Sequence, residues 1–212
     1  MTKAPRVVYL HGFASGPKSA KAVHVQHTLE REGLPCAVPD LNVPSFEHLR
    51  VSRAIEHVLS FIEGPTVVAG SSLGGLMALH AARRSRDVRA LVLMCPALVM
   101  AERWRGALGD AALERWCRDG TLRFYNHVTN DERAVDWGFY EDLVALPALE
   151  APRVPVRMIH GRRDEVVPLS LSEDLARAHP GVELTVVDDD HGLLAHKELV
   201  ARTIVEAARG VR

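Results

Sequence analysis

The sequence predicts an α/β fold, in which a mostly parallel sheet of about six strands lies between two layers of helices. Two observations predict it. Short apolar runs alternate along the chain with segments whose apolar residues recur at helical spacing. The apolar runs are continuous, which is typical of parallel strands covered by helices on both faces. A length of 212 residues, 47% of them hydrophobic, predicts one domain over residues 1–212 with a sizeable core.

Six apolar runs have the length of a strand. They are Val7–Leu10, Ala37–Leu41, Thr66–Ala69, Arg89–Cys95, Val154–His160 and Val182–Val187. Gly70, Pro96 and Gly161 directly follow three of these runs, and glycine and proline commonly end regular structure.

Helical periodicity occupies the intervals between these runs. Helices are expected over about 19–31, from 44 to the Gly64-Pro65 break, and directly after Gly74. Between Leu199 and Ala208, apolar residues at i, i+3 and i+4 spacing predict a terminal helix.

Residues 101–152 interrupt this rhythm, and we call them the cap segment. They contain no convincing strand, and helical patterns are expected near 101–118 and 140–146. Seven of the eleven aromatic residues fall here, which favours a small helical cap that lines a substrate pocket. Trp104, Trp137 and Tyr140 are the candidates for contact with substrate. The alternative is that the aromatic side chains only build a satellite core.

Composition and charge exclude several classes of function. A net charge of −1 without a basic block argues against a nucleic-acid partner. We expect neither a signal segment nor a membrane span, because no apolar run is long enough. Cys36, Cys95 and Cys117 lack metal-type spacing, and their odd number suits a reducing cytoplasm. His24 and His27 are spaced for one ion, but no third ligand completes a metal site.

The motif Gly70-x-Ser72-x-Gly74 stands between a strand and a helix. In this context it predicts a nucleophile elbow, a strained turn that holds the serine hydroxyl clear of the sheet. Free backbone N–H groups at the start of the following helix favour developing negative charge there. Ser71 is the competing serine, but it occupies the variable position of the motif.

A serine hydroxyl needs a base, and the base needs an acid, in the chain order Ser, Asp or Glu, His. His191 directly follows the last strand and is the predicted base. His179 precedes that strand, and His196 falls in the pattern of the terminal helix. Asp164 follows the preceding strand and is the predicted acid, with Glu165 as its nearest rival. The loop after the Arg89–Cys95 run offers no acid before Glu102. The aspartates beside His191 indicate a solvated acidic loop, in which one carboxylate could orient the ring; they are Asp188, Asp189 and Asp190.

A tetrahedral intermediate needs two N–H donors for its oxyanion. The residue after the nucleophile supplies one, which is Leu73 here. The loop His11-Gly12-Phe13 after the first strand supplies the other, through the Phe13 N–H. His11 itself is interpreted as a structural histidine of that loop.

Four blocks then occur in the order and spacing of the α/β-hydrolase superfamily. They are Tyr9–Pro17, Gly70–Gly75, His160–Pro168 and Asp189–His191. The chain resembles, more narrowly, the small bacterial YqiA-like esterases. The resemblance implies hydrolysis of simple carboxylic esters, often with short acyl chains or thioester acyl groups, without a cofactor. A thioesterase, peptidase or perhydrolase with the same triad, or an idle hydrolase fold that binds a small ligand, stays open as an alternative.

Overall fold

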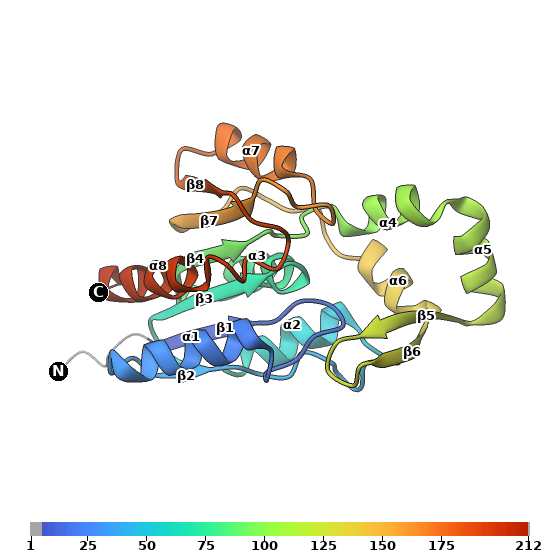
Figure 1. Ribbon diagram of the computed structural model, residues 1–212, viewed down its shortest axis with the longest axis horizontal. Helices are drawn as coiled ribbons and strands as arrows, with labels where there is room; N and C mark the ends of the chain where they lie inside the picture. Colours follow the sequence, from blue (N-terminus) through green and yellow to red (C-terminus); the bar gives the residue numbers. More distant parts are fainter. Residues whose placement is uncertain (1–5, 212) are drawn as a thin grey trace.

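The computed structural model describes residues 6–211 and contains a six-stranded, wholly parallel sheet in the order β2-β1-β3-β4-β7-β8 (Figure 1). Its strands are β1 (Arg6–Leu10), β2 (Cys36–Ala37), β3 (Thr66–Ser71), β4 (Val88–Met94), β7 (Val156–Gly161) and β8 (Val182–Val187). The predicted fold class is therefore confirmed, and five of the six predicted runs form strands at nearly the expected positions. β2 is shorter than its apolar run.

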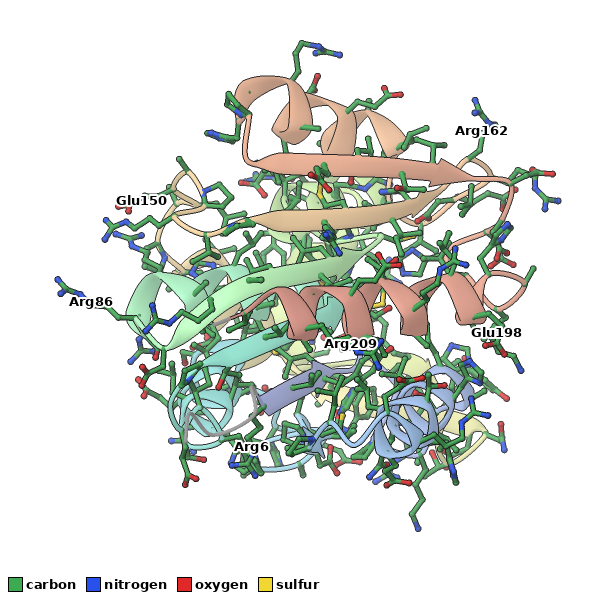
Figure 2. All side chains as sticks on the ribbon, turned by 90° about the vertical axis from the view of Figure 1, so that its left-hand side faces the viewer. Arg6, Arg86, Glu150, Arg162, Glu198 and Arg209 are labelled. Carbon is green, nitrogen blue, oxygen red and sulfur yellow. The ribbon has the colours of Figure 1, made fainter. Side chains whose placement is uncertain are left out.

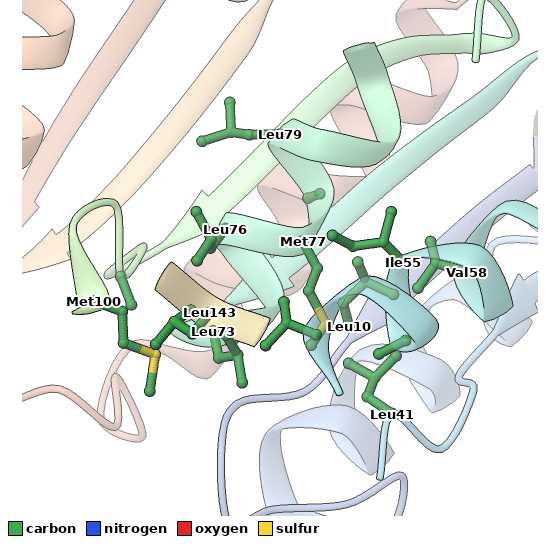
Figure 3. Close-up of a cluster of buried hydrophobic side chains, with 14 of the residues drawn as sticks. Leu10, Leu41, Ile55, Val58, Leu73, Leu76, Met77, Leu79, Met100 and Leu143 are labelled. Atoms are coloured by element: carbon green, nitrogen blue, oxygen red, sulfur yellow. The ribbon is translucent and has the colours of Figure 1, made fainter. Parts of the chain in front are cut away.

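Helices cover both faces of the sheet. α1 (Ala20–Arg31) and α8 (Lys197–Gly210) pack on one face, and α2 (Val51–Leu59), α3 (Leu73–Arg84) and α7 (Leu169–Ala178) on the other. A hydrophobic core lies on each face of the sheet. Alternate residues of each strand pack into one core or the other, because successive side chains point to opposite faces. Leu10 of β1, for example, packs with α2 and α3 side chains such as Ile55 and Met77 (Figure 3).

The outer surfaces of these layers are charged. α8 lies across the sheet with Glu198 and Arg209 at its exposed surface, and Arg86 and Arg162 project from the ends of the sheet (Figure 2). Among residues 6–211, no helix combines the length and apolarity that a membrane crossing requires.

The cap segment lies beyond the carboxyl ends of the strands (Figure 1). It contains α4 (Met100–Leu108), α5 (Asp110–Asp119), β5 (Thr121–Asn126), β6 (Asp131–Asp136) and α6 (Trp137–Val144). The expectation of a segment without strands was wrong, because β5 and β6 pair as an antiparallel hairpin. Asn126 makes its turn by accepting the N–H groups of Val128 and Thr129. The helix expected over 101–118 is divided at Gly109, whose φ is +78°.

The expected helix from residue 44 was wrong at its start, since α2 begins only at Val51. Contacts with the cap segment hold the preceding residues out of helical geometry. The Glu47 carbonyl accepts the Asp136 N–H at 2.8 Å, and Arg50 donates to both Asp136 carboxylate oxygens at 2.7 and 3.1 Å. Tertiary hydrogen bonds therefore outweigh the local periodicity that predicted the helix.

The turn between β3 and α3 is strained. Ser72 has φ +54° and ψ −117°, a conformation that costs a non-glycine residue about 1–3 kcal/mol. Two glycines make it possible. A Cβ at Gly70 would overlap the Gly74 carbonyl, and a Cβ at Gly74 would overlap the Leu10 carbonyl of β1. Only glycine therefore allows β1, β3 and α3 to meet this closely.

Replacing Gly74 by alanine is expected to lower the free energy of unfolding by about 3 kcal/mol or more, because the new methyl group meets backbone on β1. Urea denaturation measures the loss. Gly106→Ala, in α4 with open space around the new Cβ, is the matched control and should gain about 0.5–1 kcal/mol. Equal stabilities of Gly74→Ala and wild type would contradict the packing described here.

Candidate active site

The predicted site lies at the carboxyl edge of the sheet, where the strand order reverses. The chain leaves β1 toward β2 on one side and then returns to form β3 on the other side of β1. Ligand crevices of open α/β sheets lie at such a switch point. The loops after the two strands touch there, since a Cβ at Gly12 would lie 3.3 Å from the Ser72 Cβ.

Ser72 is held by its backbone while its hydroxyl is left available. Its N–H donates to the Met94 carbonyl at 2.9 Å, and its carbonyl accepts the Ala97 N–H at 3.1 Å. Its side chain makes no capping bond to α3, although it stands at the helix N-terminus. Ser71, in contrast, is the buried last residue of β3.

Asp164 and His191 meet as the sequence predicts. His191 Nδ1 and Asp164 Oδ2 are 2.7 Å apart, while Asp164 Oδ1 accepts the N–H groups of Val166 and Val167, both at 2.8 Å. Because a carboxylate only accepts, Nδ1 carries the hydrogen and Nε2 keeps a free lone pair. The rival Glu165 is exposed.

The charge of Asp164 is strongly stabilised. Its side chain has no exposed surface. Burial alone would raise its pKa, but hydrogen bonds from His160 and His191 and from the Val167 N–H outweigh burial and hold the pKa far below the usual range. Asp164 is therefore a fixed anion against which an imidazolium at His191 can form.

Cys95, at the end of β4, links the serine to this pair. Its Sγ, an Asp164 oxygen and a His191 nitrogen lie within 4.8 Å of one another, and residues 94 and 97 on either side bond the Ser72 backbone. The Ser72 backbone and the Asp164–His191 pair thus both lie beside the residues that follow β4. Among residues 6–211, the hydrogen bond of the His191 ring is to Asp164, so transfer of a proton from Ser72 belongs to the proposal below.

Cys95, Asp164 and His191 form a cluster of three potential metal ligands. Two ligands of one tetrahedral zinc ion stand about 3.3 Å apart, given metal–ligand bonds near 2.0 Å. The oxygen and nitrogen here are 2.7 Å apart, which is hydrogen-bond distance. Burial also raises the pKa of the Cys95 thiol, so a thiolate ligand is disfavoured. A shared proton fits this arrangement, and a metal ion does not.

The acidic loop before His191 is more ordered than the expected solvated loop. Asp189 is buried and accepts from the N–H and Nδ1 of His196 at 3.2 and 2.9 Å. Asp190 accepts the Gly192 N–H at 2.7 Å. These bonds fix the loop that carries His191, and His196 is the residue that precedes α8.

The two predicted oxyanion donors are also available. Within residues 6–211, neither the Phe13 N–H nor the Leu73 N–H bonds an acceptor outside helix or strand ladders. Leu73 is the first residue of α3, where N–H groups lack helical partners. His11 is a structural residue, as expected, because its Nδ1 donates to the Gly12 carbonyl at 2.9 Å and its Nε2 accepts the Leu41 N–H at 3.0 Å.

The cap segment packs directly on the Phe13 ring. Trp104, Phe124 and Phe139 have ring centroids 5.1–5.3 Å from it. Trp137 instead stacks obliquely on Tyr140 at 5.0 Å, and the Tyr140 hydroxyl donates to the Ala101 carbonyl at 3.3 Å.

An apolar groove of about 550 Å³ runs between the cap segment and α7. Its walls include Leu76, Leu98, Leu143 and Leu175, and Tyr140 contributes to them. Among the described residues that line it, Trp104 and Trp137 do not appear. Of the three aromatic candidates, Tyr140 therefore lies on the groove and Trp104 lies against the oxyanion loop.

Sequence reasoning missed two side chains around Asp164. They are Cys95 and His160, each at the carboxyl end of its strand. The signal that could have found them is their place at the same edge as the triad.

Comparisons with known proteins identify a family and related enzymes. The profile of the uncharacterised protein family UPF0227 matches residues 6–205. Pimeloyl-(acyl-carrier protein) methyl ester esterase of Methylococcus capsulatus is 30% identical, with 70% of this chain and 72% of that protein covered. Palmitoyl-protein thioesterase ABHD10 of the mouse is 26% identical over 82% of this chain, which spans only 63% of that protein.

Solved structures share the fold. Mouse alpha/beta hydrolase domain-containing protein 10 superposes with a TM-score of 0.78 at 25% identity, covering 98% of this chain and 90% of that one. Est1E of Butyrivibrio proteoclasticus, solved with ferulic acid, has a TM-score of 0.82 at 24% identity, covering 97% and 88%. The latter likeness concerns the fold alone.

The depressed pKa of Asp164 makes a prediction about stability. A carboxyl with a lowered folded-state pKa stabilises the fold above its unfolded pKa of about 3.9, and this contribution is lost as pH falls toward the folded value. Wild type should exceed Asp164→Asn in free energy of unfolding at pH 7, and the gap should shrink below about pH 4. Chemical denaturation across pH measures it, with Glu165→Gln as the exposed control. A gap independent of pH would contradict the assignment.

Proposed function

Because the chain belongs to the UPF0227 family and is a member of the α/β-hydrolase superfamily, we propose that it is a serine esterase that works through an acyl-enzyme. The observation that carries this proposal is the bond between the fully buried Asp164 carboxylate and His191 Nδ1. It leaves Nε2 as a base on the rim where the strained turn presents the Ser72 hydroxyl.

Each step of the proposed reaction is assigned to a named residue. Ser72 Oγ attacks the ester carbonyl carbon while its proton passes to His191 Nε2, and the Phe13 and Leu73 N–H groups hold the oxyanion. As the intermediate collapses, the C–O bond to the alcohol breaks and His191 returns the proton to the leaving oxygen. Water then attacks the acyl-enzyme with His191 again as base, releasing the acid and Ser72. Asp164 stays ionised throughout and stabilises the imidazolium.

The proposed substrate is a small-molecule carboxylic ester, with short acyl chains favoured by the resemblance to YqiA-like esterases. The relatives support ester chemistry by name, one as a methyl ester esterase and one as a thioesterase. A thioesterase is the second candidate, because one relative is named as a thioesterase. The apolar groove lined by Leu76 and Leu98 suits the acyl chain of either substrate. We place the enzyme in the cytoplasm, a setting that suits Cys36, Cys95 and Cys117, which are all free thiols.

The cap segment is proposed to shape the pocket through its aromatic side chains. Trp104 contacts the Phe13 ring at 5.1 Å, and Tyr140 lines the groove. Trp137 packs against the Tyr140 ring. In this proposal the cap segment sets which acyl groups fit, while the core performs the chemistry.

Ser72→Ala is expected to reduce p-nitrophenyl ester turnover by about a thousandfold or more, because no other hydroxyl can form the acyl-enzyme. Purified protein, assayed kinetically and labelled with a fluorophosphonate probe, supplies the measurement. Ser71→Ala is the matched control and should keep both activity and labelling. Undiminished turnover in Ser72→Ala would contradict the mechanism, and a wild type that is folded but never labelled would favour an idle ligand-binding fold.

Trp104→Ala should change the preference for acyl-chain length while Ser72 remains reactive. The substitution removes a ring that packs on Phe13 and so opens space beside the oxyanion loop. Assays with p-nitrophenyl esters and acyl-CoAs of graded length measure kcat/KM, and also decide between ester and thioester substrates. Trp137→Ala is the comparison, because Trp137 contacts Trp116 and Tyr140 and does not contact Phe13. An unchanged chain-length profile in Trp104→Ala would contradict a pocket at this position.

A further inference from the structure

A second histidine reaches the acid of the proposed triad from inside the protein. His160 is the penultimate residue of β7 and is completely buried. Its Nε2 lies 3.2 Å from Asp164 Oδ2 and 3.0 Å from the Val167 carbonyl oxygen. Its Nδ1 lies 2.8 Å from the hydroxyl of Ser172 on α7. Ser172 is also completely buried.

These partners assign the hydrogens of the ring. The carboxylate and the carbonyl only accept, so Nε2 carries a hydrogen, which bonds the Val167 carbonyl and lies close to Asp164 Oδ2. A buried imidazole costs less free energy when it is neutral, so Nδ1 accepts and the Ser172 hydroxyl donates to it. Every polar atom of the pair is then satisfied. The Nε2–H group donates to the Val167 carbonyl and lies beside the Asp164 oxygen that also receives His191.

Asp164 consequently accepts three hydrogen bonds and has the His160 N–H group as a fourth polar neighbour. Two backbone N–H groups saturate Oδ1, while His191 and His160 approach Oδ2 from the solvent side and the interior side. A carboxylate bound at both oxygens cannot rotate about its terminal bond. The orientation of the His191 ring is therefore set by contacts that lie outside the three residues Ser72, Asp164 and His191.

We propose that His160, oriented by Ser172, is a positioning residue that fixes Asp164 Oδ2 for His191. The inference rests on the proposed function, since it concerns the same triad. Ser172, His160 and Asp164 form a buried series of polar contacts, which meets His191 at one shared carboxylate oxygen. The residues of this buried series do not contact substrate, because neither Ser172 nor His160 has exposed surface.

The alternative is that His160 only fills space in the core. A purely structural residue would change stability without changing how activity depends on pH. A positioning residue has a different signature. Its N–H dipole opposes positive charge at His191, so its removal should favour the imidazolium and move the acid limb of the pH–activity profile to higher pH. Its removal also loosens Asp164, which should lower kcat more than it changes KM.

Other titratable groups near Asp164 and His191 come from separate elements. They are Cys95 after β4, Lys21 on α1, and Asp189 and Asp190 in the loop after β8. Burial raises the pKa of Cys95 and lowers that of Lys21, against the opposing effect of the surrounding anionic groups on Lys21. The variants below leave all four unchanged, so a displaced acid limb reports the loss of the His160 donor.

The experiment compares His160→Met, which has no donor, with His160→Gln, whose amide can present an N–H near the position of Nε2. His160→Met should lower kcat about tenfold with KM little changed and shift the acid limb upward. His160→Gln should recover most of kcat and the original limb. Ser172→Ala keeps the ring but removes its orienting donor, and should show the same changes to a smaller extent even if His160→Met folds poorly.

Val156→Ala is the matched control, since it creates a cavity at the far end of the same strand. It should lower Tm without altering kcat or the pH profile. If the histidine variants and Ser172→Ala keep the wild-type kcat and pH profile, or if Gln and Met are equally impaired with an unshifted limb, the positioning role is overturned and the triad stands. Retained activity in Ser72→Ala would instead overturn the proposed function itself.

Discussion

The structure depends on one steric constraint, the approach of β1, β3 and α3 at the turn that carries Ser72. The serine backbone sits in a left-handed conformation that only its surroundings maintain. Those surroundings are backbone atoms of Gly70, Gly74 and Leu10, packed too closely for any side chain. This packing brings Gly12 against Ser72 and places the loop after β1 beside the helix N-terminus. The glycines therefore determine where the hydroxyl and the two free N–H groups stand.

The electrostatics of the site are arranged around a second fixed point, the Asp164 carboxylate. Among residues 6–211, backbone and imidazole groups surround this buried carboxylate, and neither lysine nor arginine forms an ion pair with it. Such neutral donors hold a carboxylate ionised without neutralising it. The negative charge thus remains available to an imidazolium at His191, whereas an arginine at this position would have cancelled it.

Much of the fold and of the candidate site could be predicted from the sequence, because those parts depend on local signals. The elbow glycines, the continuous apolar runs and the loop after β7 each stand within a few residues of what they determine. The hairpin of β5 and β6 was missed because β6 is mostly charged and shows no apolar alternation, while the alternation of Leu122 and Phe124 in β5 covers too few residues to predict a strand by itself. The start of α2 was misplaced because Arg50 and Glu47 bond a cap residue 86 or more positions away. The role of His160 was invisible for the same reason, since Ser172 and Asp164 meet it only after folding.

Phe13 contributes both to the proposed active site and to the packing of the cap segment. Its N–H is a proposed oxyanion donor, and its side chain is the centre of the aromatic cluster that anchors the cap segment. A rearrangement of the cap segment that admits a bulkier acyl group must repack this ring and so displace the loop that holds the donor. Under the proposed mechanism, selectivity and transition-state stabilisation are mechanically coupled, so a change of substrate range would require compensating changes in the loop after β1.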